Sequence, residues 1–560
     1  MSNGDRTLLV PPHNGDHVLP NLPFFEKLLR YASRSTPLIA IRDVNADVEK
    51  TYSQLLVDGL ALRKKLRQIL SPNIQEDLLQ DREVPIALLA PGGYEYAVGF
   101  IAILALGAAV VPLTVVLPTE EASTLIRRAR CAAIVCSRGS MNLAQSVSSI
   151  QHPSSIPYLS IDSYTNSSPT SPTIERLTIS SNRELDPNAA ALVIFTSGTT
   201  GPPKGAVQRR SYLTRAAEAI ADHYGITETD TILHLLPVHH ITGVAINFLP
   251  YLVTGACVEF RSGSFDAAWT WERWRRGGLT VFSGVPTIYI RMMRYFESNR
   301  LSEDQRQLYM NGARSLRVLL CGTSALPAPV QNFWTRILDG KPILTRYGAT
   351  EIGVCFMMGP DEPHIPPNSV GRAVPGLEVK LDEEGMVLVK GPHIFSKYLY
   401  DEQATADAHD AEGYFKTGDI ARRDGPCYSI LGRASLDIIK SGGYKISALD
   451  IEREILGLDY VAEVMVVGVP DDEYGQRVGA AVSLKDSSHS GKGLLERIRH
   501  DLRSKLAGYK LPTVLRVVQG ELPKSATGKV QKRILGPEYF PTGYRVDREV
   551  EVWGERRMKL

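Results

Sequence analysis

Apolar runs of strand length alternate with helical segments along the first third of the chain. Residues 84–90 (VPIALLA) predict a buried strand, residues 91–107 predict a turn and a helix, and residues 108–113 (AAVVPL) predict a second strand. Residues 131–137 (CAAIVCS) predict another short strand. Because parallel strands need crossover connections, this order of elements predicts a parallel sheet that is covered by helices on both faces.

One apolar segment, residues 97–118, carries no charged side chain and is long enough to cross a bilayer. Gly107 and Pro112 interrupt it. A glycine commonly ends a helix, and a continuous apolar run is typical of a strand that is buried on both faces. We therefore expect an apolar helix that ends at the glycine, a buried strand after it, and no membrane span.

Two later regions differ from this pattern. Residues 138–188 are rich in Ser, Pro and Asn, which predicts a long surface loop. After Tyr414, a strand, a glycine turn and a helix from near Ser447 are followed by two further strands and an amphipathic helix over residues 494–506. These elements predict a compact α+β unit of roughly 130 residues, an ordinary domain size. The residues after Arg533 show no clear pattern.

Composition and charge exclude several classes of protein. The chain has 560 residues, with 63 Lys and Arg against 61 Asp and Glu, so its net charge is +2. That balance argues against a dedicated nucleic-acid binder, which carries a basic stripe or patch. Six cysteines without a CxxC pair argue against a disulfide framework and a zinc site, and they favour a reducing compartment. The length is typical of roughly three or four domain-sized units.

Targeting signals are weak at both ends. The first residues lack the apolar core of a signal peptide and contain acidic residues and prolines, which do not suit a transit peptide. The last three residues only loosely resemble the Ser-Lys-Leu peroxisomal address, because Met558 occupies the position where a small residue is needed. We expect a cytoplasmic protein, with a mitochondrial or a peroxisomal location as alternatives.

The strongest local feature is residues 191–207 (ALVIFTSGTTGPPKGAV). The first five residues predict a buried strand, and the loop that follows combines hydroxyl groups, glycines and a lysine. Small residues let backbone N–H groups approach an anion, and hydroxyl and ammonium groups add donors, so this loop suits phosphates. The Walker A pattern is excluded because Lys204 precedes Gly205. The candidate phosphate-binding residues are Thr196, Ser197, Gly198, Thr199, Thr200, Gly201 and Lys204.

The segment TSGTTGPPKG resembles the phosphate loop of the adenylate-forming (AMP-binding) enzyme superfamily, which includes acyl-CoA synthetases, peptide-synthetase adenylation domains and luciferases. Four further motifs follow in the family's order: RYGATEIG (346–353), YFKTGDIARRDG (414–425), LGRASLDIIKSGGYKIS (431–447) and PKSATGKVQKR (523–533). The resemblance covers nearly the whole chain and is closest to the malonyl-CoA synthetase-like branch.

The resemblance implies an α/β fold in two parts. A large N-terminal domain, residues 1–431, would bind ATP and the acid and would contain doubly wound parallel sheets and a small β-barrel. A small, mobile α+β domain, residues 432–560, would act as a lid that carries the adenylation lysine. The implied cosubstrates are ATP, with Mg²⁺, and CoA. The expected partners are small molecules, with no nucleic acid, and the oligomeric state stays open.

The nucleotide-binding motifs have physical interpretations beside the family roles. A carboxylate beside a phosphate loop needs a cation between them, and Mg²⁺ prefers oxygen ligands and accompanies ATP. The resemblance implies that Glu351 binds Mg²⁺, Thr350 contacts the α-phosphate and Tyr347 stacks on adenine. It also makes Asp419 and Arg433 the ribose contacts, because a carboxylate can accept hydrogen bonds from two vicinal hydroxyl groups. A helix or turn cap is the alternative role for Asp419.

Lys529, in PKSATGK, is the predicted catalytic lysine. The resemblance implies that it swings into the site and bridges the substrate carboxylate and the α-phosphate, where negative charge builds up during attack. Rotation of the lid about residues 432–437 would then remove it. An extra residue in GRASLD leaves the hinge open between Ser435 and Leu436. The residues expected to line the CoA tunnel are Lys440, Ser441, Gly442 and Gly443.

The candidate acid-binding residues lie in three segments. His240, also a catalytic candidate, aligns with a residue that lines the acyl pocket, and a hydrogen-bonded core histidine is the alternative. Residues 286–296 predict a helix that begins with proline. This helix resembles one in malonyl-CoA synthetases whose arginine grips the distal carboxylate of a dicarboxylic acid. Arg291 matches that arginine, with an ordinary surface ion pair as the alternative. Gly322 and Thr323 complete the set.

These residues predict an ATP-dependent acid–CoA ligase. A carboxylate attacks ATP to give an acyl-adenylate and pyrophosphate, and the CoA thiol then attacks the adenylate, which has the good leaving group that a carboxylate lacks. The predicted acid is a short dicarboxylic acid such as malonate or methylmalonate. One alternative is a ligase for medium-chain fatty or aryl acids or a carrier-protein adenylation enzyme, although no carrier domain is recognised after residue 535. The other is a non-catalytic nucleotide-binding protein.

Overall fold

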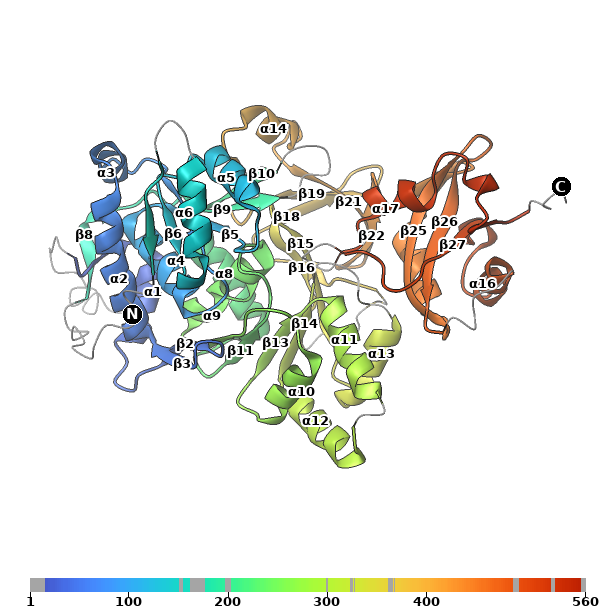
Figure 1. The fold of residues 1–560 in the computed structure, drawn as a ribbon, viewed down its shortest axis with the longest axis horizontal. Coiled ribbons are helices and arrows are strands. Elements are labelled where there is room, and N and C mark those ends of the chain that lie inside the picture. Colours follow the sequence, from blue (N-terminus) through green and yellow to red (C-terminus); the bar gives the residue numbers. More distant parts are fainter. Residues whose placement is uncertain are drawn as a thin grey trace.

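The computed structural model describes residues 16–150, 155–161, 177–196, 203–298, 301–322, 326, 328–360, 366, 368–486, 493–524 and 529–554. The strands in these ranges form sheets of seven, thirteen and six strands and one two-stranded pair. Figure 1 shows the two larger sheets with their helices on one side and the six-stranded sheet, in orange and red, on the other. The predicted α/β fold is confirmed.

The first sheet consists of seven strands: β4 (Pro85–Leu89), β5 (Ala109–Leu113), β6 (Ile134–Cys136), β7 (Tyr158–Ser160), β9 (Ala190–Thr196), β10 (Lys204–Arg209) and β20 (Lys397–Tyr398). Their order is β20-β10-β9-β5-β4-β6-β7. The strands from β9 to β7 run parallel, whereas β10 pairs antiparallel with both β9 and β20. The parallel sheet predicted from the alternating pattern is therefore confirmed.

Some residues of the predicted phosphate loop belong to strands. β9 ends at Thr196, and β10 begins at Lys204, which lies opposite Thr196 in the antiparallel pair. Lys204 and Gly205 are therefore strand residues and not loop residues, which corrects the prediction. The glycine suits this strand because a Cβ on it would lie 2.9 Å from Val193 Cγ1. Ser197, Gly198, Thr199, Thr200 and Gly201 lie outside the described residues.

Helix α4 (Tyr94–Leu106) contains the first part of the charge-free segment, and all its residues except Glu95 are buried. It ends at Gly107, whose φ of 90° is the left-handed conformation that caps many helices. The buried strand β5 follows, so the interpretation as a core helix and strand is confirmed. Within the ranges given above, no helix is both long and apolar enough to cross a bilayer.

The surface loop predicted for residues 138–188 is wrong. The described part of this stretch contains helix α6 (Met141–Ile150), strand β7 and strand β8 (Thr178–Glu184). β7 extends the parallel sheet, and β8 pairs with β1 (Val18–Asn21). The polar residues of α6 mostly occupy its exposed side, with a short apolar stripe buried against the sheet. The polar composition therefore gave a wrong prediction, because each of these elements buries only a few residues.

The thirteen-stranded sheet has a parallel part and an antiparallel part. The parallel strands are β2 (Ile39–Asp43), β12 (Cys257–Phe260), β11 (Thr231–His234), β13 (Val281–Gly284), β14 (Val318–Cys321) and β15 (Leu344–Ala349), with β3 (Val48–Thr51) antiparallel at the edge. The antiparallel part continues through β16 (Gly353–Met357), β17 (Arg372–Ala373), β22 (Cys427–Arg433), β21 (Phe415–Asp424), β19 (Met386–Lys390) and β18 (Glu378–Leu381). It occupies the place that the resemblance gave to a small β-barrel.

The order of this sheet determines where functional groups meet. β13, β14 and β15 are parallel neighbours, so their carboxyl ends lie side by side next to the antiparallel strands. Ligands of open parallel sheets bind at such ends. Helix α11 (Pro286–Glu297) follows β13 and begins with a proline, as predicted.

The six-stranded sheet contains β23 (Ile438–Ser441), β24 (Tyr444–Ser447), β25 (Val461–Asp471), β26 (Gly475–Leu484), β27 (Val514–Val517) and β28 (Val550–Val552). Helices α15 (Ala448–Leu456) and α16 (Leu494–Leu502) accompany it, and Ser447 caps α15 through its side chain. The predicted α+β unit is thus present. Its limit at residue 432 stays a prediction.

The chain end does contain regular structure, although the sequence showed no clear pattern there. Helix α17 (Lys532–Tyr539) and strand β28 lie after or around residue 533. Phe540, Tyr544 and Val550 are buried in one cluster with residues of β25 and β27. The elements are short and their apolar residues are widely spaced, so periodicity could not reveal them.

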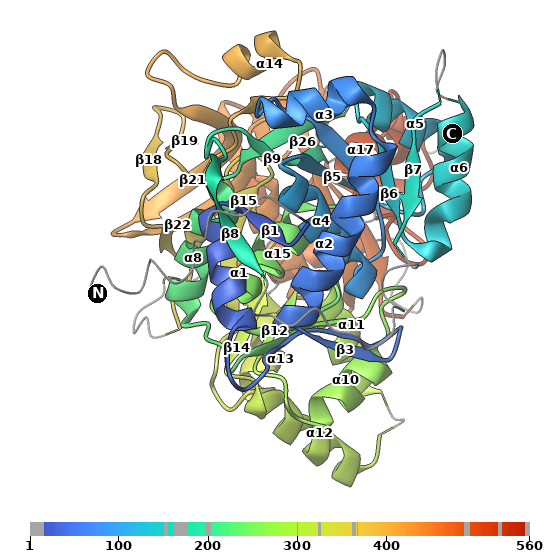
Figure 2. The same ribbon diagram turned by 90° about the vertical axis from the view of Figure 1, so that its left-hand side faces the viewer.

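Helices α2 (Tyr52–Ile69) and α4 lie against one another (Figure 2), and Gly59 permits their close approach. An alanine at residue 59 would place its Cβ 2.6 Å from Ile101 Cγ2. We expect Gly59→Ala to lower the free energy of unfolding by about 1–3 kcal/mol through overpacking, although alanine favours helices. Urea unfolding followed by circular dichroism measures this change. Gly139→Ala, whose Cβ would meet nothing within 4 Å, is the control. A Gly59→Ala protein as stable as wild type would contradict the close contact.

Candidate active site

An aspartate at the centre of the antiparallel strands is held by two donors. Asp419 on β21 lies opposite Arg433 on β22, and Arg433 Nε donates to Asp419 Oδ1 at 2.9 Å. The Tyr347 hydroxyl donates to the other carboxylate oxygen at 2.6 Å. Asp419 is 6% exposed. Each oxygen keeps a further lone pair, so the fixed carboxylate can still accept hydrogen bonds from a diol. The structure thus brings together the two predicted ribose contacts and the predicted adenine contact.

Tyr347 is part of a short aromatic stack. Its ring lies 5.5 Å from that of Phe356, which stacks on Tyr428 at 4.2 Å. Burial raises the pKa of the Tyr347 hydroxyl, and the charge of Asp419 raises it further. The hydroxyl therefore remains protonated and acts as a donor across the neutral pH range.

A second carboxylate, Glu351, lies just after β15. The Tyr398 hydroxyl donates to Glu351 Oε1 at 2.8 Å, and Lys204 Nζ lies 5.1 Å from the centre of the Tyr398 ring. Gln208 Nε2 donates to the carbonyl oxygen of Thr350 at 2.7 Å. The predicted phosphate-loop lysine and the predicted Mg²⁺ ligand therefore share one tyrosine. Sequence reasoning missed Tyr398, because no motif includes it.

The turn that presents Thr350 and Glu351 depends on Gly348. The register of β15 and β16 shifts between Tyr347 and Gly348. A Cβ on Gly348 would lie 1.9 Å from the carbonyl oxygen of Gly353, which no side chain allows. The glycine of the RYGATE motif is therefore required by close backbone approach.

Lys529 extends from the lid into the region of these groups. Its side chain is exposed to solvent, yet partial desolvation by the surrounding protein lowers its pKa. The positive charge of Arg433 acts in the same direction, whereas Asp419 and Asp437 oppose it. The charges of the two predicted ribose contacts, Asp419 and Arg433, therefore act on the predicted catalytic lysine.

His240 lies within the electrostatic reach of the same lysine. Burial lowers the pKa of His240, and the charge of Lys529 lowers it further, so the ring is neutral at pH 7. Its Nε2 is buried and has no hydrogen-bond partner in the described part of the chain. The adjacent His239 ring lies 4.2 Å away, and burial brings the pKa of His239 to about 3. The alternative of a core histidine satisfied by hydrogen bonds does not describe Nε2 of His240.

Two of the predicted acid-binding residues, Arg291 and Gly322, differ in their exposure to solvent. Arg291 is exposed on α11. Gly322 directly follows β14, at the carboxyl ends of the parallel strands, and Thr323 lies outside the described residues.

Sequence reasoning missed a buried arginine beside Gly322. Arg346 on β15 is 5% exposed, and its Nη2 donates to Ser283 Oγ on β13 at 2.7 Å. A Cβ on Gly322 would lie 3.2 Å from Arg346 Nε. Nη1 is buried and has no hydrogen-bond partner in the described ranges. Its position in the RYGATE motif could have drawn attention to it, but sequence does not reveal that the side chain is buried.

The predicted hinge and CoA turn lie at the start of the lid. The Arg433 backbone N–H donates to Asp437 Oδ2 at 3.0 Å, and Lys532 Nζ contacts Asp437 Oδ1 at 2.6 Å and Glu452 Oε1 at 2.7 Å. The Gly442 N–H donates to the carbonyl oxygen of Tyr474 at 2.9 Å. The predicted CoA residues Lys440, Ser441, Gly442 and Gly443 form the end of β23 and the turn that follows.

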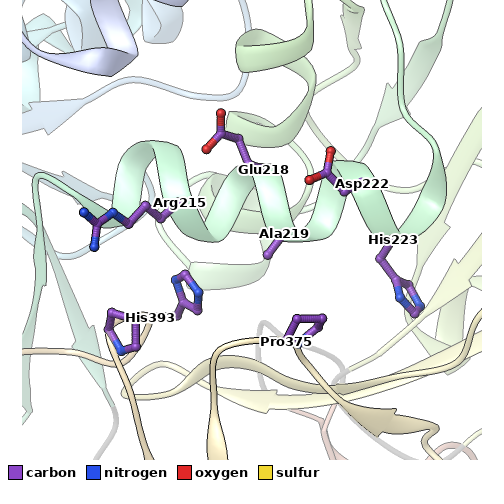
Figure 3. A pocket seen from close by; sticks show the side chains of 8 residues that line it. Arg215, Glu218, Ala219, Asp222, His223, Pro375 and His393 are labelled. Carbon is purple, nitrogen blue, oxygen red and sulfur yellow. The ribbon is translucent and has the colours of Figure 1, made fainter.

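A separate cavity of about 590 Å³ lies elsewhere in the large domain. Arg215, Glu218, Asp222 and His223 of one helix line it together with His393. In Figure 3, Ala219 and His223 point from this helix toward the side on which Pro375 and His393 lie. The cavity shares no lining residue with the groups described above. Its mixed charges and open shape do not identify a ligand.

Parallel sheets with polar groups at their strand ends, together with a separate α+β unit that carries Lys529, are typical of a nucleotide-dependent ligase. The AMP-binding enzyme family profile matches residues 76–399, and that of the AMP-binding enzyme C-terminal domain matches residues 450–529. The chain belongs to the AMP-binding enzyme family. It is an acid–thiol ligase.

Individual relatives are similar over nearly the full length. A mitochondrial malonate–CoA ligase (ACSF3) of Xenopus laevis is 32% identical, with 95% of this chain and 93% of that protein covered. A CoA ligase of Gibberella moniliformis is 31% identical, with 93% and 95% covered. The ATP-bound structure of MatB from Rhodopseudomonas palustris has a TM-score of 0.76 at 24% identity, with 93% and 99% covered, and this likeness concerns the fold.

The requirement for a glycine at residue 348 predicts a strong effect on activity. Gly348→Ala should move the backbone that presents Thr350 and Glu351, because its Cβ cannot fit beside the Gly353 carbonyl. We expect kcat/KM to fall roughly 100-fold, as is typical when catalytic groups are misplaced by about 1 Å. Steady-state pyrophosphate release measures the change, with Gly139→Ala as the control. Wild-type kcat/KM in Gly348→Ala would show that the turn does not position these groups.

Proposed function

We propose that this ligase acts on a short dicarboxylic acid such as malonate or methylmalonate and forms its CoA thioester through an acyl-adenylate. The observation that carries the proposal is the buried guanidinium of Arg346, whose Nη1 has no partner in the described ranges. The Xenopus relative, named as a malonate–CoA ligase, supports the same substrate class.

A buried arginine without a counter-ion is costly, because its charge has left water and has gained no opposite charge in return. Ser283 compensates for only part of this loss. A carboxylate would supply the missing charge and accept two hydrogen bonds from the planar guanidinium. A dicarboxylic acid has one carboxylate to react and a second one to be held. Arg346 and Arg291 are the candidates for the second contact, and Arg346 is favoured because an ion pair is stronger where water is excluded.

The remaining groups support the adenylation step. Asp419 and Arg433 would hold the ribose and Tyr347 the adenine, while Lys204 and the loop before it would contact the phosphates. Glu351 offers carboxylate oxygens of the kind that Mg²⁺ prefers, and Mg²⁺ would neutralise part of the phosphate charge. Thr350 would contact the α-phosphate. Lys529 would place its ammonium between the attacking carboxylate and the α-phosphate. The neutral ring of His240 would form part of the acid pocket wall beside the lysine.

The lid would then rotate so that CoA can attack. We propose the boundary at residues 431 and 432 and a hinge at Ser435 or Leu436. Two contacts support this hinge: the Ala434 N–H donates to Gly418 of the large domain, whereas Asp437 is paired with Lys532 of the lid. In the rotated state, the turn formed by Lys440, Ser441, Gly442 and Gly443 would face the CoA tunnel. We propose a cytoplasmic location. A mitochondrial location is the alternative, since the Xenopus relative is named as mitochondrial.

The substrate proposal predicts opposite effects on activity and stability at residue 346. Arg346→Met should lower kcat/KM for malonate roughly 10- to 100-fold, the value of a charge-assisted hydrogen bond, and should change kcat/KM for butyrate little. The unliganded variant should be as stable as wild type or more stable, because an unpaired buried charge is replaced by an apolar side chain. Thioester formation and urea unfolding measure the two effects, with Arg336→Met on an exposed helix position as the control.

Arg291→Ala separates the two candidate arginines. If Arg291 holds the distal carboxylate, malonate activity falls in this variant and not in Arg346→Met. Equal losses for malonate and butyrate in both variants would sink the dicarboxylate proposal.

The role proposed for Lys529 can be tested on the separate half-reactions. Lys529→Ala should abolish adenylate formation, because the charge that stabilises the attack is lost. It should largely spare thioester formation from supplied acyl-adenylate and CoA. Loss of both half-reactions would mean that the residue is structural.

An acid panel distinguishes the proposal from its alternatives. Malonate, methylmalonate, hexanoate and benzoate are each incubated with ATP, Mg²⁺ and CoA, and the thioester is detected by mass spectrometry. We expect thioesters of the two dicarboxylic acids. Products from hexanoate or benzoate alone would support the fatty- or aryl-acid alternative. Adenylate without thioester would support a carrier-protein acceptor.

A further inference from the structure

A cluster of four charged residues joins the acid-site helix α11 to the lid. Arg294 Nη1 lies 3.5 Å from Glu521 Oε1, and Arg294 Nη2 lies 3.9 Å from Glu463 Oε1. Figure 1 shows α11 on the side of the large domain that faces the lid sheet. Arg294 lies one helical turn after Arg291, on the same side of α11. We call Arg294, Glu463, Glu521 and Lys524 the Arg294 cluster.

The lid half of the Arg294 cluster is tightly connected. Lys524 Nζ lies 2.6 Å from Glu463 Oε1 and 3.5 Å from Glu521 Oε2. The Leu522 N–H donates to Glu463 Oε2 at 2.8 Å. Glu463 therefore accepts from both the backbone and the side chain of the segment 521–524. The two carboxylates that meet Arg294 fix this segment.

The same segment is the base of the loop that carries Lys529. Lys524 forms an antiparallel bridge with Val530, the residue after Lys529. A displacement of the Glu463 and Glu521 carboxylates would therefore reach Lys529 through this bridge, because Val530 is the next residue in the chain. Arg294 is the member of the cluster that belongs to the large domain.

We propose that Arg294 is a positioning residue that holds the lid in the orientation in which Lys529 reaches the site. It thereby favours adenylation over thioester formation. The positioning role of Arg294 rests on the role proposed for Lys529 and does not depend on which acid is the substrate. The Arg294 and Glu521 side chains are 41% and 57% exposed, so their attraction is modest and screened by salt. A modest attraction suits a lid that must leave after one step.

Two experiments test this proposal: assays of the separate half-reactions, and a double variant in which the charges of Arg294 and Glu521 are swapped. Arg294→Met should slow acid-dependent ATP–pyrophosphate exchange roughly three- to tenfold, as expected for the loss of exposed ion pairs. Thioester formation from supplied acyl-adenylate should be unchanged or faster. Arg294→Glu should lower the rate of ATP–pyrophosphate exchange further. The double variant Arg294→Glu with Glu521→Arg should restore part of this rate. Arg276→Met, on an exposed helix end away from the lid, is the matched control.

The possible results separate this proposal from that for Lys529. Unchanged exchange in Arg294→Met, or equal losses in both half-reactions, would overturn the positioning role. Failure of the charge exchange to restore any activity over Arg294→Glu would also count against it. Adenylation that survives in Lys529→Ala would instead overturn the role of the lysine. Raising sodium chloride to roughly 0.5 M should narrow the difference between wild type and Arg294→Met, because salt screens exposed pairs.

Discussion

The geometry of the site depends on the Asp419 carboxylate. It accepts from Arg433 on the neighbouring strand β22 and from Tyr347 on β15, which three strands of the sheet separate from β21. One buried group thereby fixes the distance between the ends of the parallel strands and the antiparallel strands. Arg433 is also the last residue of β22, immediately before the segment that leads to the lid. The pair proposed to hold the ribose therefore lies directly beside the proposed hinge.

Contiguous motifs were the part of the site that sequence could predict. Asp419, Glu351 and Lys529 each lie in a short pattern of small and polar residues, and the structure places them in one region. Tyr398 and the burial of Arg346 could not be predicted, because both depend on strands that are distant in sequence. The fold shows the same limit. Long buried strands were recognised, whereas the polar stretch 138–188 was misjudged because α6, β7 and β8 each bury few residues.

Two arginines in this protein illustrate two energetic regimes. Arg346 is buried, and its Nη1 has no hydrogen-bond partner among the residues that the structure describes, so an anionic ligand could offset its desolvation cost. A buried guanidinium favours an anionic ligand over a neutral one, since a neutral ligand would leave its charge without a counter-ion. Arg294 is half-exposed between two carboxylates, where water compensates for lost contacts. It can contribute to a conformational preference, but it cannot by itself lock one state.

The lid has both kinds of contact, buried ion pairs and exposed ones. Near the hinge, Lys532 is paired with Asp437 and Glu452 in the interior, and burial raises the pKa of Glu452 while Lys532 opposes that change. These three residues all belong to the lid side of the proposed hinge, so they can stay together as the domain rotates. Across the proposed hinge, the polar contacts in the described ranges include the Arg433 N–H contact to Asp437, the exposed pair of Lys445 with Glu384 at 2.9 Å, and the exposed Arg294 pairs. A rotation that breaks exposed, hydrated contacts and keeps the buried ones intact costs less free energy, and this is the rotation that the proposed role of Lys529 requires.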